Sequence, residues 1–155
     1  MSVSLYGNGQ TVIQVVYGST TTQVATTSTS YVNTNITASI TPQSTTSKIL
    51  VQVTASYDLG NASESFGFQV VRNSTVVFTP QGADGGGPLY TFINLSQEII
   101  GPVAFSFVDS PSSTSSLTYT VQFRKRNGSS TVTVPTSQSA GTGTATIILM
   151  EISGS

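Results

Sequence analysis

Apolar and polar residues alternate without a break from Val32 to Ile40. Successive side chains of an extended strand point to opposite faces, so this pattern predicts a strand with one face in a core and the other toward water or a partner. Residues 49–57, 66–70, 103–107 and 119–123 repeat the pattern with branched and aromatic side chains. Helical periodicity is hard to find, which predicts an all-β protein.

Shorter runs add candidate strands at residues 12–17, 23–26, 75–78, 89–95 and 131–134. About ten strands at this spacing are typical of a sandwich or a barrel. We predict a two-sheet antiparallel β-sandwich, jelly-roll-like in form; an immunoglobulin-like sandwich stays open, although the chain is long for one. Asn127-Gly128 favours a hairpin between the strands on either side of it. The 155 residues fit one domain at 12–155, preceded by an anchoring segment at 1–11.

The last run, residues 145–152, is apolar on both faces. Ile147 and Leu149 point one way, while Ile148, Met150 and Ile152 point the other. A strand of this kind is central in its sheet or is covered by another subunit.

Charged residues make up only 7% of the chain, against about 25% in an average soluble domain. Ser and Thr together number 50, and the net charge is −1. Such a surface has no field to attract nucleic acid or an acidic membrane, and near-zero charge favours association. The chain has no Cys and no His, which excludes thiolate chemistry and His-containing triads. No segment reads as a secretory signal or a membrane span.

Few residues suggest chemistry. Asp58 and Glu64 flank a loop and would have to converge for hydrolysis, whereas loop-solvating acids are far commoner. The glycine-rich residues 82–88 lack the Lys-Ser/Thr ending of a phosphate loop and favour a surface loop. Arg124-Lys125-Arg126 suits an acidic partner or a polysaccharide carboxylate, or equally a charged strand end that blunts edge pairing.

Several short sequence motifs together indicate a family resemblance, above all ITPQSTTSKILV (residues 40–51) and VDSP (residues 108–111). With FQVVRNSTVVF and the closing TATIILMEI, they make the sequence resemble a β-rich domain of tailed-phage virion proteins, particularly those of cyanophages. That domain occurs in tail-fibre-like chains and in stand-alone structural proteins. The resemblance spans about residues 12–152 and implies a non-enzymatic virion component without a cofactor, similar to trimeric jelly-roll knobs.

Fibre members carry a long shaft before this domain, and here only about eleven residues precede it. We therefore expect a capsid decoration or cement protein, located in the virion and bound to the major capsid protein or another virion protein. Shell or neighbour contacts are expected at Leu5, Tyr6, Val12 and Ile13. A homotrimer seam is expected at Ile148, Met150 and Ile152.

Two alternatives stay open. A tail-fibre tip would recognise a host-surface glycan or protein through the loops at one end, with contacts at Asp84, Gly85, Gly86, Ser112 and Ser113. A secreted glycosidase or carbohydrate-binding module is more remote, because the chain shows no clear carboxylate pair and has no Trp for a sugar platform.

Overall fold

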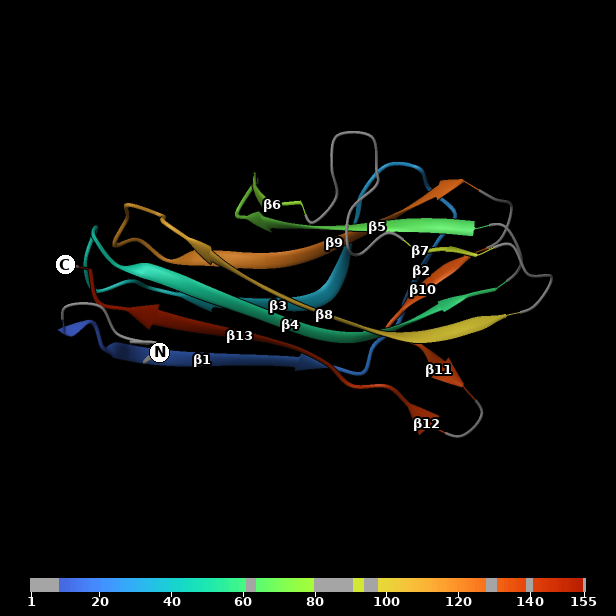
Figure 1. The fold of residues 1–155 in the computed structure, drawn as a ribbon, viewed down its shortest axis with the longest axis horizontal. Coiled ribbons are helices and arrows are strands. Elements are labelled where there is room, and N and C mark those ends of the chain that lie inside the picture. The colour runs from blue at the N-terminus through green and yellow to red at the C-terminus, as the bar shows by residue number, and fades with distance from the viewer. Residues whose placement is uncertain are drawn as a thin grey trace, which may run out of the picture.

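The computed structural model describes residues 9–60, 64–79, 91–93, 98–127, 131–138 and 141–154. Their strands form two antiparallel sheets that face each other as two layers (Figure 1). The four main strands of sheet A lie side by side in the order β1 (Val12–Thr20), β13 (Ala145–Ile152), β4 (Lys48–Leu59) and β8 (Ile99–Asp109). At the C-terminal end of β4, the short strand β10 (Val132–Val134) also pairs with it, and β2 (Val24–Thr26) pairs with β10. Sheet B contains β3 (Val32–Ile40), β9 (Leu117–Asn127), β5 (Glu64–Arg72) and β6 (Thr75–Phe78), with β7 (Thr91–Ile93) beside β5. A small ladder joins β11 (Ser137–Gln138) and β12 (Gly141–Thr142).

The chain changes sheet at most of its long connections, from β3 to β4, β4 to β5, β8 to β9 and β9 to β10. The resulting orders, β1-β13-β4-β8 opposite β3-β9-β5-β6, are those of a jelly roll. The predicted all-β, jelly-roll-like sandwich is confirmed.

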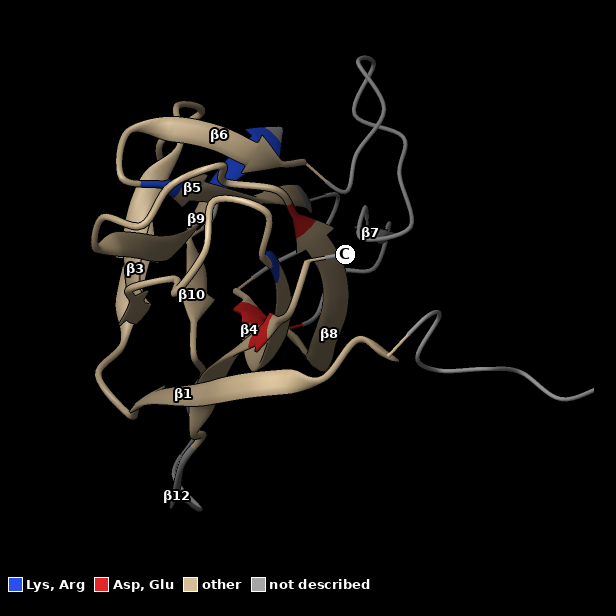
Figure 2. Cartoon of the chain, turned by 90° about the vertical axis from the view of Figure 1, so that its left-hand side faces the viewer, with Lys and Arg blue, Asp and Glu red and all other residues tan. Residues whose placement is uncertain are grey.

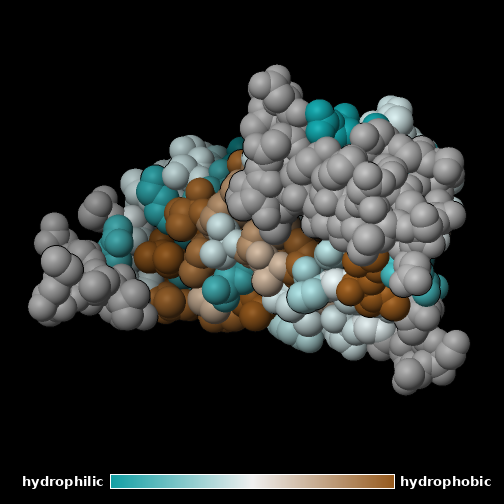
Figure 3. Space-filling view, turned by 45° about the vertical axis from the view of Figure 1, so that its right-hand side comes forward, coloured by the Kyte–Doolittle hydropathy of each residue, from teal (hydrophilic) through white to brown (hydrophobic). Residues whose placement is uncertain are grey.

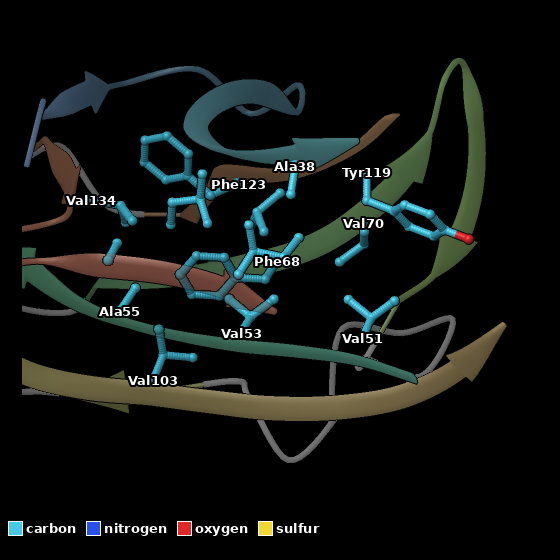
Figure 4. Close-up of a cluster of buried hydrophobic side chains, with 14 of the residues drawn as sticks. Ala38, Val51, Val53, Ala55, Phe68, Val70, Val103, Tyr119, Phe123 and Val134 are labelled. Carbon is cyan, nitrogen blue, oxygen red and sulfur yellow. The ribbon is translucent and has the colours of Figure 1, made fainter. Parts of the chain in front are cut away.

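Alternating side chains from both sheets fill the space between the layers. Figure 4 shows Phe68 of β5 in the middle of this core, between Val53 of β4 and Phe123 of β9. Phe68 and Phe123 are fully buried, and their rings lie 6.4 Å apart. The five alternating faces predicted from the sequence all point inward, although Phe105 and Phe107 are only partly buried.

One local prediction is wrong. Asn127-Gly128 does not join a hairpin, because β9 lies in sheet B between β3 and β5, whereas β10 pairs with β2 and β4 in sheet A. The connection instead crosses from one layer to the other. A two-residue turn does occur at Asn73-Ser74, between β5 and β6. Asn73 has φ of 55°, a left-handed conformation that asparagine tolerates better than most residues.

The two long sides of the sandwich close differently. On the side of β6 and β8, the Phe78 ring stacks on Phe107 at 4.3 Å and on Phe105 at 5.5 Å. On the side of β1 and β3, the backbones approach each other at Gly18. A Cβ atom added there would overlap the Thr37 carbonyl oxygen and touch Ile147 and Ala38. Aromatic rings thus close one side of the sandwich. The other side is closed by the direct approach of the β1 and β3 backbones, which glycine allows.

We expect Gly18→Ala to destabilise the fold by about 1–3 kcal/mol, the usual effect of overpacking a tight contact. Ser19→Ala is the control, because the Ser19 side chain is exposed on the same strand. Urea unfolding followed by circular dichroism measures both variants. Equal stability of Gly18→Ala and the unsubstituted protein would show that β1 and β3 do not approach this closely.

A buried carboxylate joins three segments at the end of the sandwich where β1 begins and β13 ends. Glu151 of β13 is fully buried. Its oxygens accept hydrogen bonds from Gln14 Nε2 of β1 at 2.6 Å and from the Gln43 backbone N–H of the β3–β4 turn at 2.7 Å. Gln14 Nε2 also donates to the Thr41 carbonyl at 2.8 Å. Burial by itself raises the pKa of Glu151, but hydrogen bonds from the Gln14 side chain and the backbone of Gln43 and Ser44 outweigh it, so the pKa falls below its ordinary value.

We expect Glu151→Gln to lower the free energy of unfolding by about 2–3 kcal/mol at pH 7, because the amide has one accepting oxygen and its NH2 group would face one of the two N–H donors. The folded pKa is depressed, so the stabilisation is present above the unfolded pKa of about 4.3. It is lost as the pH falls from there through the lower folded value. Urea titrations between pH 7 and pH 3 measure this.

The control is Glu98→Gln, at an exposed carboxylate just before β8, which we expect to change stability by less than about 0.5 kcal/mol. A Glu151→Gln protein that kept the same loss of stability on acidification would assign that loss to other groups.

Candidate interaction surface

The outer face of sheet A carries an apolar row across all four of its main strands. The strand registers place Val15 of β1 opposite Met150 of β13, Met150 opposite Leu50 of β4, and Leu50 opposite Val108 of β8. We call Val15, Met150, Leu50 and Val108 the outer row. Directly opposed side chains on one face of a sheet are neighbours in contact, so the row is a continuous apolar strip.

Further apolar side chains widen this strip near β1 and β13. Tyr17 lies opposite Ile148 in the next row, and Val12 lies opposite Ile152 at the end of the sheet. The large side chains at the edges are more than half exposed: Val15 by 57%, Tyr17 by 60% and Val108 by 58%. Figure 3 shows apolar atoms gathered in brown areas over part of the face it presents, beside polar areas. Exposed apolar side chains aligned in this way mark interaction surfaces.

Few charges lie on this face, and on β4 they are Lys48 and Asp58, at the two ends of the strand and outside the outer row. The β1 strand contains no charged residue, and Figure 2 shows it without any basic or acidic colour. The carboxylate of Glu151 is buried, and that of Asp109 is 12% exposed. Lys48, at the end of β4, donates to the Ser110 hydroxyl at 2.7 Å. A shallow hollow of about 330 Å³ lies beside the outer row, lined among others by Gln52, Ser106 and Ile148.

The outer face of sheet B is different in kind. Its hydroxyl and amide side chains bond to one another across the strands: Ser39 with Thr118 at 2.7 Å, Thr37 with Thr120 at 3.1 Å, and Gln122 Nε2 with Asn33 Oδ1 at 2.7 Å. Gln69 Nε2 donates to Gln122 Oε1 as well. A face whose polar side chains already bond to one another is suited to contact with water rather than with a protein partner. Sheet A therefore carries the candidate interaction surface.

The most strongly connected polar cluster lies between the sheets at one end. Asp109 of β8 forms an ion pair with Arg72 of β5 and accepts a hydrogen bond from the Tyr119 hydroxyl of β9 at 2.7 Å. Burial first, and then this hydrogen bond, raise the pKa of Tyr119 above its ordinary value. The tyrosine therefore stays a neutral donor, and the cluster ties β8 to sheet B. The Arg72 guanidinium and the Tyr119 hydroxyl both bond to the Asp109 carboxylate, so all three polar groups serve the structure of the fold.

One residue of the predicted shell contact lies beside the predicted trimer seam. Val12, expected to contact the shell, is 42% exposed and lies opposite Ile152, expected in the trimer seam. Ile13 is half-buried at an irregularity in the register, and Ile148 and Met150 lie on the same outer face as Ile152. Their roles stay predictions. Leu5, Tyr6, Asp84, Gly85 and Gly86 lie outside the described residues.

Sequence reasoning missed the part of the surface that comes from β1, β4 and β8. Leu50 and Val108 belong to strands whose other face was assigned to the core, and the run 12–17, which contains Val15 and Tyr17, was assigned no face. The run Ile49-Leu50-Val51 is apolar on both faces, and it was the signal that β4 has a second apolar side.

The remaining candidates do not form a site with this surface. Strand alternation separates the basic cluster, since Lys125 is buried while Arg124 lies 4.8 Å from the centre of the Tyr31 ring. Ser112 has φ of 49° and lines a hydroxyl-rich hollow with Lys48 and Ser110, and the Ser113 hydroxyl accepts the Ser115 N–H. The side chain of Glu64 lies outside the described residues, so whether it converges with Asp58 or only solvates a loop stays as the sequence left it.

Within the described residues, no group of three or more His, Cys, Asp or Glu side chains is placed to hold a metal ion. The same residues include no helix of the length and apolarity that a membrane span requires. No model of a known protein family matches the chain, and none of the curated proteins compared with it matches either.

Proposed function

We propose that this chain is a non-enzymatic structural protein of a tailed-phage virion, which forms a homotrimer through the outer face of sheet A and binds the capsid as a decoration protein. The observation that carries the proposal is the outer row, a strip of apolar side chains that crosses the whole sheet and is exposed at both ends. Its action is binding: each subunit adds contact area between capsid proteins, and three linked subunits bind more tightly than one.

The chemistry of the face favours further copies of this chain as its occupant. Identical molecules repel through like charges wherever these are concentrated, and the outer row contains none. The net charge of −1 adds little repulsion between whole molecules. Aromatic side chains and Met are enriched in the cores of protein interfaces, and this face carries Tyr17 and Met150. Three faces turned toward a common axis would bury Ile148, Met150 and Ile152 together.

The assignment to a virion is supported by the resemblance to phage structural domains in residues 40–51 and 108–111. The described part of the chain is consistent with it in two respects. Its fold is a jelly roll, and Val12 and Ile13 stand at one end of the sheet, beside the buried Glu151. A trimer built on sheet A would present these ends together on one side, where they would meet a capsid surface.

We expect Met150→Glu to weaken self-association by about two orders of magnitude or more, because an unpaired carboxylate buried at an interface costs about 3 kcal/mol or more. Met150 faces outward, so the fold should keep most of its stability. Val76→Glu is the control, since Val76 is also half exposed but lies on β6 of sheet B. Sedimentation equilibrium at micromolar concentration measures the effect.

A chain that sediments as a monomer under these conditions contradicts the trimer. Equal weakening by Val76→Glu and Met150→Glu contradicts the choice of sheet A.

We expect the protein in purified particles of the phage that encodes it, at a copy number set by the capsid lattice rather than by the tail. Quantitative mass spectrometry of particles, with the major capsid protein as the internal reference, measures that number. A count of only a few copies per particle would reject decoration and favour the tail-fibre tip.

A further inference from the structure

The β8 strand has an edge whose partner is missing from the described part of the chain. Along one side β8 pairs with β4 over its whole length, from Ile99 opposite Leu59 to Asp109 opposite Ile49, without a register shift. No strand of the described residues pairs with its other side. An edge of this kind presents a row of backbone N–H and C=O groups, which is a template for another strand.

The usual protections of an exposed edge are absent from the middle of β8. Natural edges carry lysines, prolines, inward-pointing charges or bulges that prevent strand addition, and the one proline of β8, Pro102, lies before its middle part. Residues 103–108, with the sequence VAFSFV, contain no charge, and the register through them is regular. Short uncharged segments rich in branched and aromatic residues pair readily with other strands.

Pro102 shows which backbone groups point outward. Within an antiparallel ladder, alternate residues direct both their N–H and C=O groups to the same neighbour. A proline has no N–H, so in an edge strand it takes a position that faces away from the ladder. Pro102 lies opposite Ser56 of β4. Ala104, Ser106 and Val108 have the same parity, so their N–H and C=O groups are the ones that face the open edge.

The opposite edge of the four main strands of sheet A is β1, which suits β8 in its direction and in its lack of charge. Neighbours in the order β1-β13-β4-β8 are all antiparallel, so β1 and β8 run in opposite directions. A β1 strand of a second copy, added beside β8 in the same sheet, would therefore be antiparallel to it. The β1 strand has no charged residue, and no strand of the described residues pairs with its outer side, so residues 12–20 are open for pairing.

The outer row ends at the same two edges. Val15 on β1 is 57% exposed and Val108 on β8 is 58% exposed, and each lacks an apolar neighbour on its open side within the described residues. Adding β1 of one copy to β8 of another with the row in register places Val108 beside Val15. One contact then covers both exposed ends, and the row becomes continuous from one copy to the next.

We propose that the edge of β8 pairs with β1 of a second copy of this chain, head to tail, and that three copies close into a ring. The proposal rests on the proposed function, because it specifies how the copies join. A head-to-tail contact uses different surfaces on the two partners, and it forms a ring when its rotation closes. The three A sheets then stand as walls around the axis, with Ile148 and Met150 facing inward.

Ser106→Pro tests the edge directly. It removes an N–H that faces outward in the proposed geometry while leaving the β4 ladder complete. Ser106→Ala keeps the N–H and is the matched control. We expect Ser106→Pro to shift the protein from trimer to monomer in sedimentation velocity, and Ser106→Ala to remain trimeric. Ala104→Lys, which adds a charge at an exposed edge position, should give the same dissociation without a backbone change. Circular dichroism and thermal unfolding confirm that each variant is folded.

Disulfide trapping tests the partner and the register. The chain has no cysteine, so single cysteines can be placed without interference. Directly opposed strand residues have Cα atoms about 4.5–5.5 Å apart, which suits a disulfide. Val15→Cys mixed with Val108→Cys should form a covalent dimer on mild oxidation at micromolar concentration. Either variant alone should form none.

The outcomes separate this inference from the proposed function. Trimers that survive both Ser106→Pro and Ala104→Lys overturn the edge pairing and leave association through the face of sheet A intact. Covalent dimers of Val108→Cys alone overturn the head-to-tail arrangement in favour of a two-fold contact between β8 strands. A monomeric unsubstituted protein overturns the trimer of the proposed function, and the ring with it.

Discussion

The buried carboxylate of Glu151 determines which side chains of β13 point outward. Side chains alternate along a strand, so a slip of one residue in the pairing of β13 would turn Met150 into the core and place the Glu151 carboxylate outside. The bonds from Gln14 and from the Gln43 backbone hold the carboxylate inside. These donors come from β1 and from the β3–β4 turn, so one side chain fixes the register of three segments. The outward position of Ile148, Met150 and Ile152 follows from that register.

The hydroxyl-rich composition has different consequences on the two faces of the molecule. On sheet B, Ser, Thr, Asn and Gln side chains bond to one another in pairs across the strands, which leaves few donors and acceptors for a partner. On sheet A the outward positions of the outer row are apolar. A protein with few charges cannot use charge repulsion to stay separate, so in the proposed trimer this division of polar and apolar faces selects sheet A for association. The polar sheet protects one side from unwanted contact.

The period of two in the sequence predicted most of the strands, because it depends only on neighbouring residues. The strand 32–40, the inward faces of β4, β5, β8 and β9, and the two-sided character of β13 are all as predicted. Pairing between strands was harder to predict, since it joins residues far apart in the chain. Asn127-Gly128 has the local signal of a hairpin, yet its two strands belong to opposite layers. The local rule failed there because the core requires β9 and β10 in different sheets.

The candidate surface shows the same limit. Sequence reasoning found Ile148, Met150 and Ile152, because β13 is apolar at every position from Ile147 to Met150. It did not find Val15 and Val108, because each stands next to an apolar residue of the opposite face and joins the surface only through the register with Met150 and Leu50. Nor could it show that the ion pair of Arg72 with Asp109 would hold the end of β8 against sheet B.

The ion pair of Arg72 with Asp109 also affects how selectively the unprotected edge of β8 could pair with another strand. Asp109 ends β8 and is held by Arg72 and Tyr119, while Phe105 and Phe107 are held by Phe78. The inward side of β8 is thus fixed to sheet B along residues 105–109. A strand that cannot twist away or unfold presents its outward backbone groups at fixed positions. Rigid presentation favours a partner whose own groups match in spacing and direction, as we propose for β1 of an identical chain, over the irregular pairing that leads to aggregation.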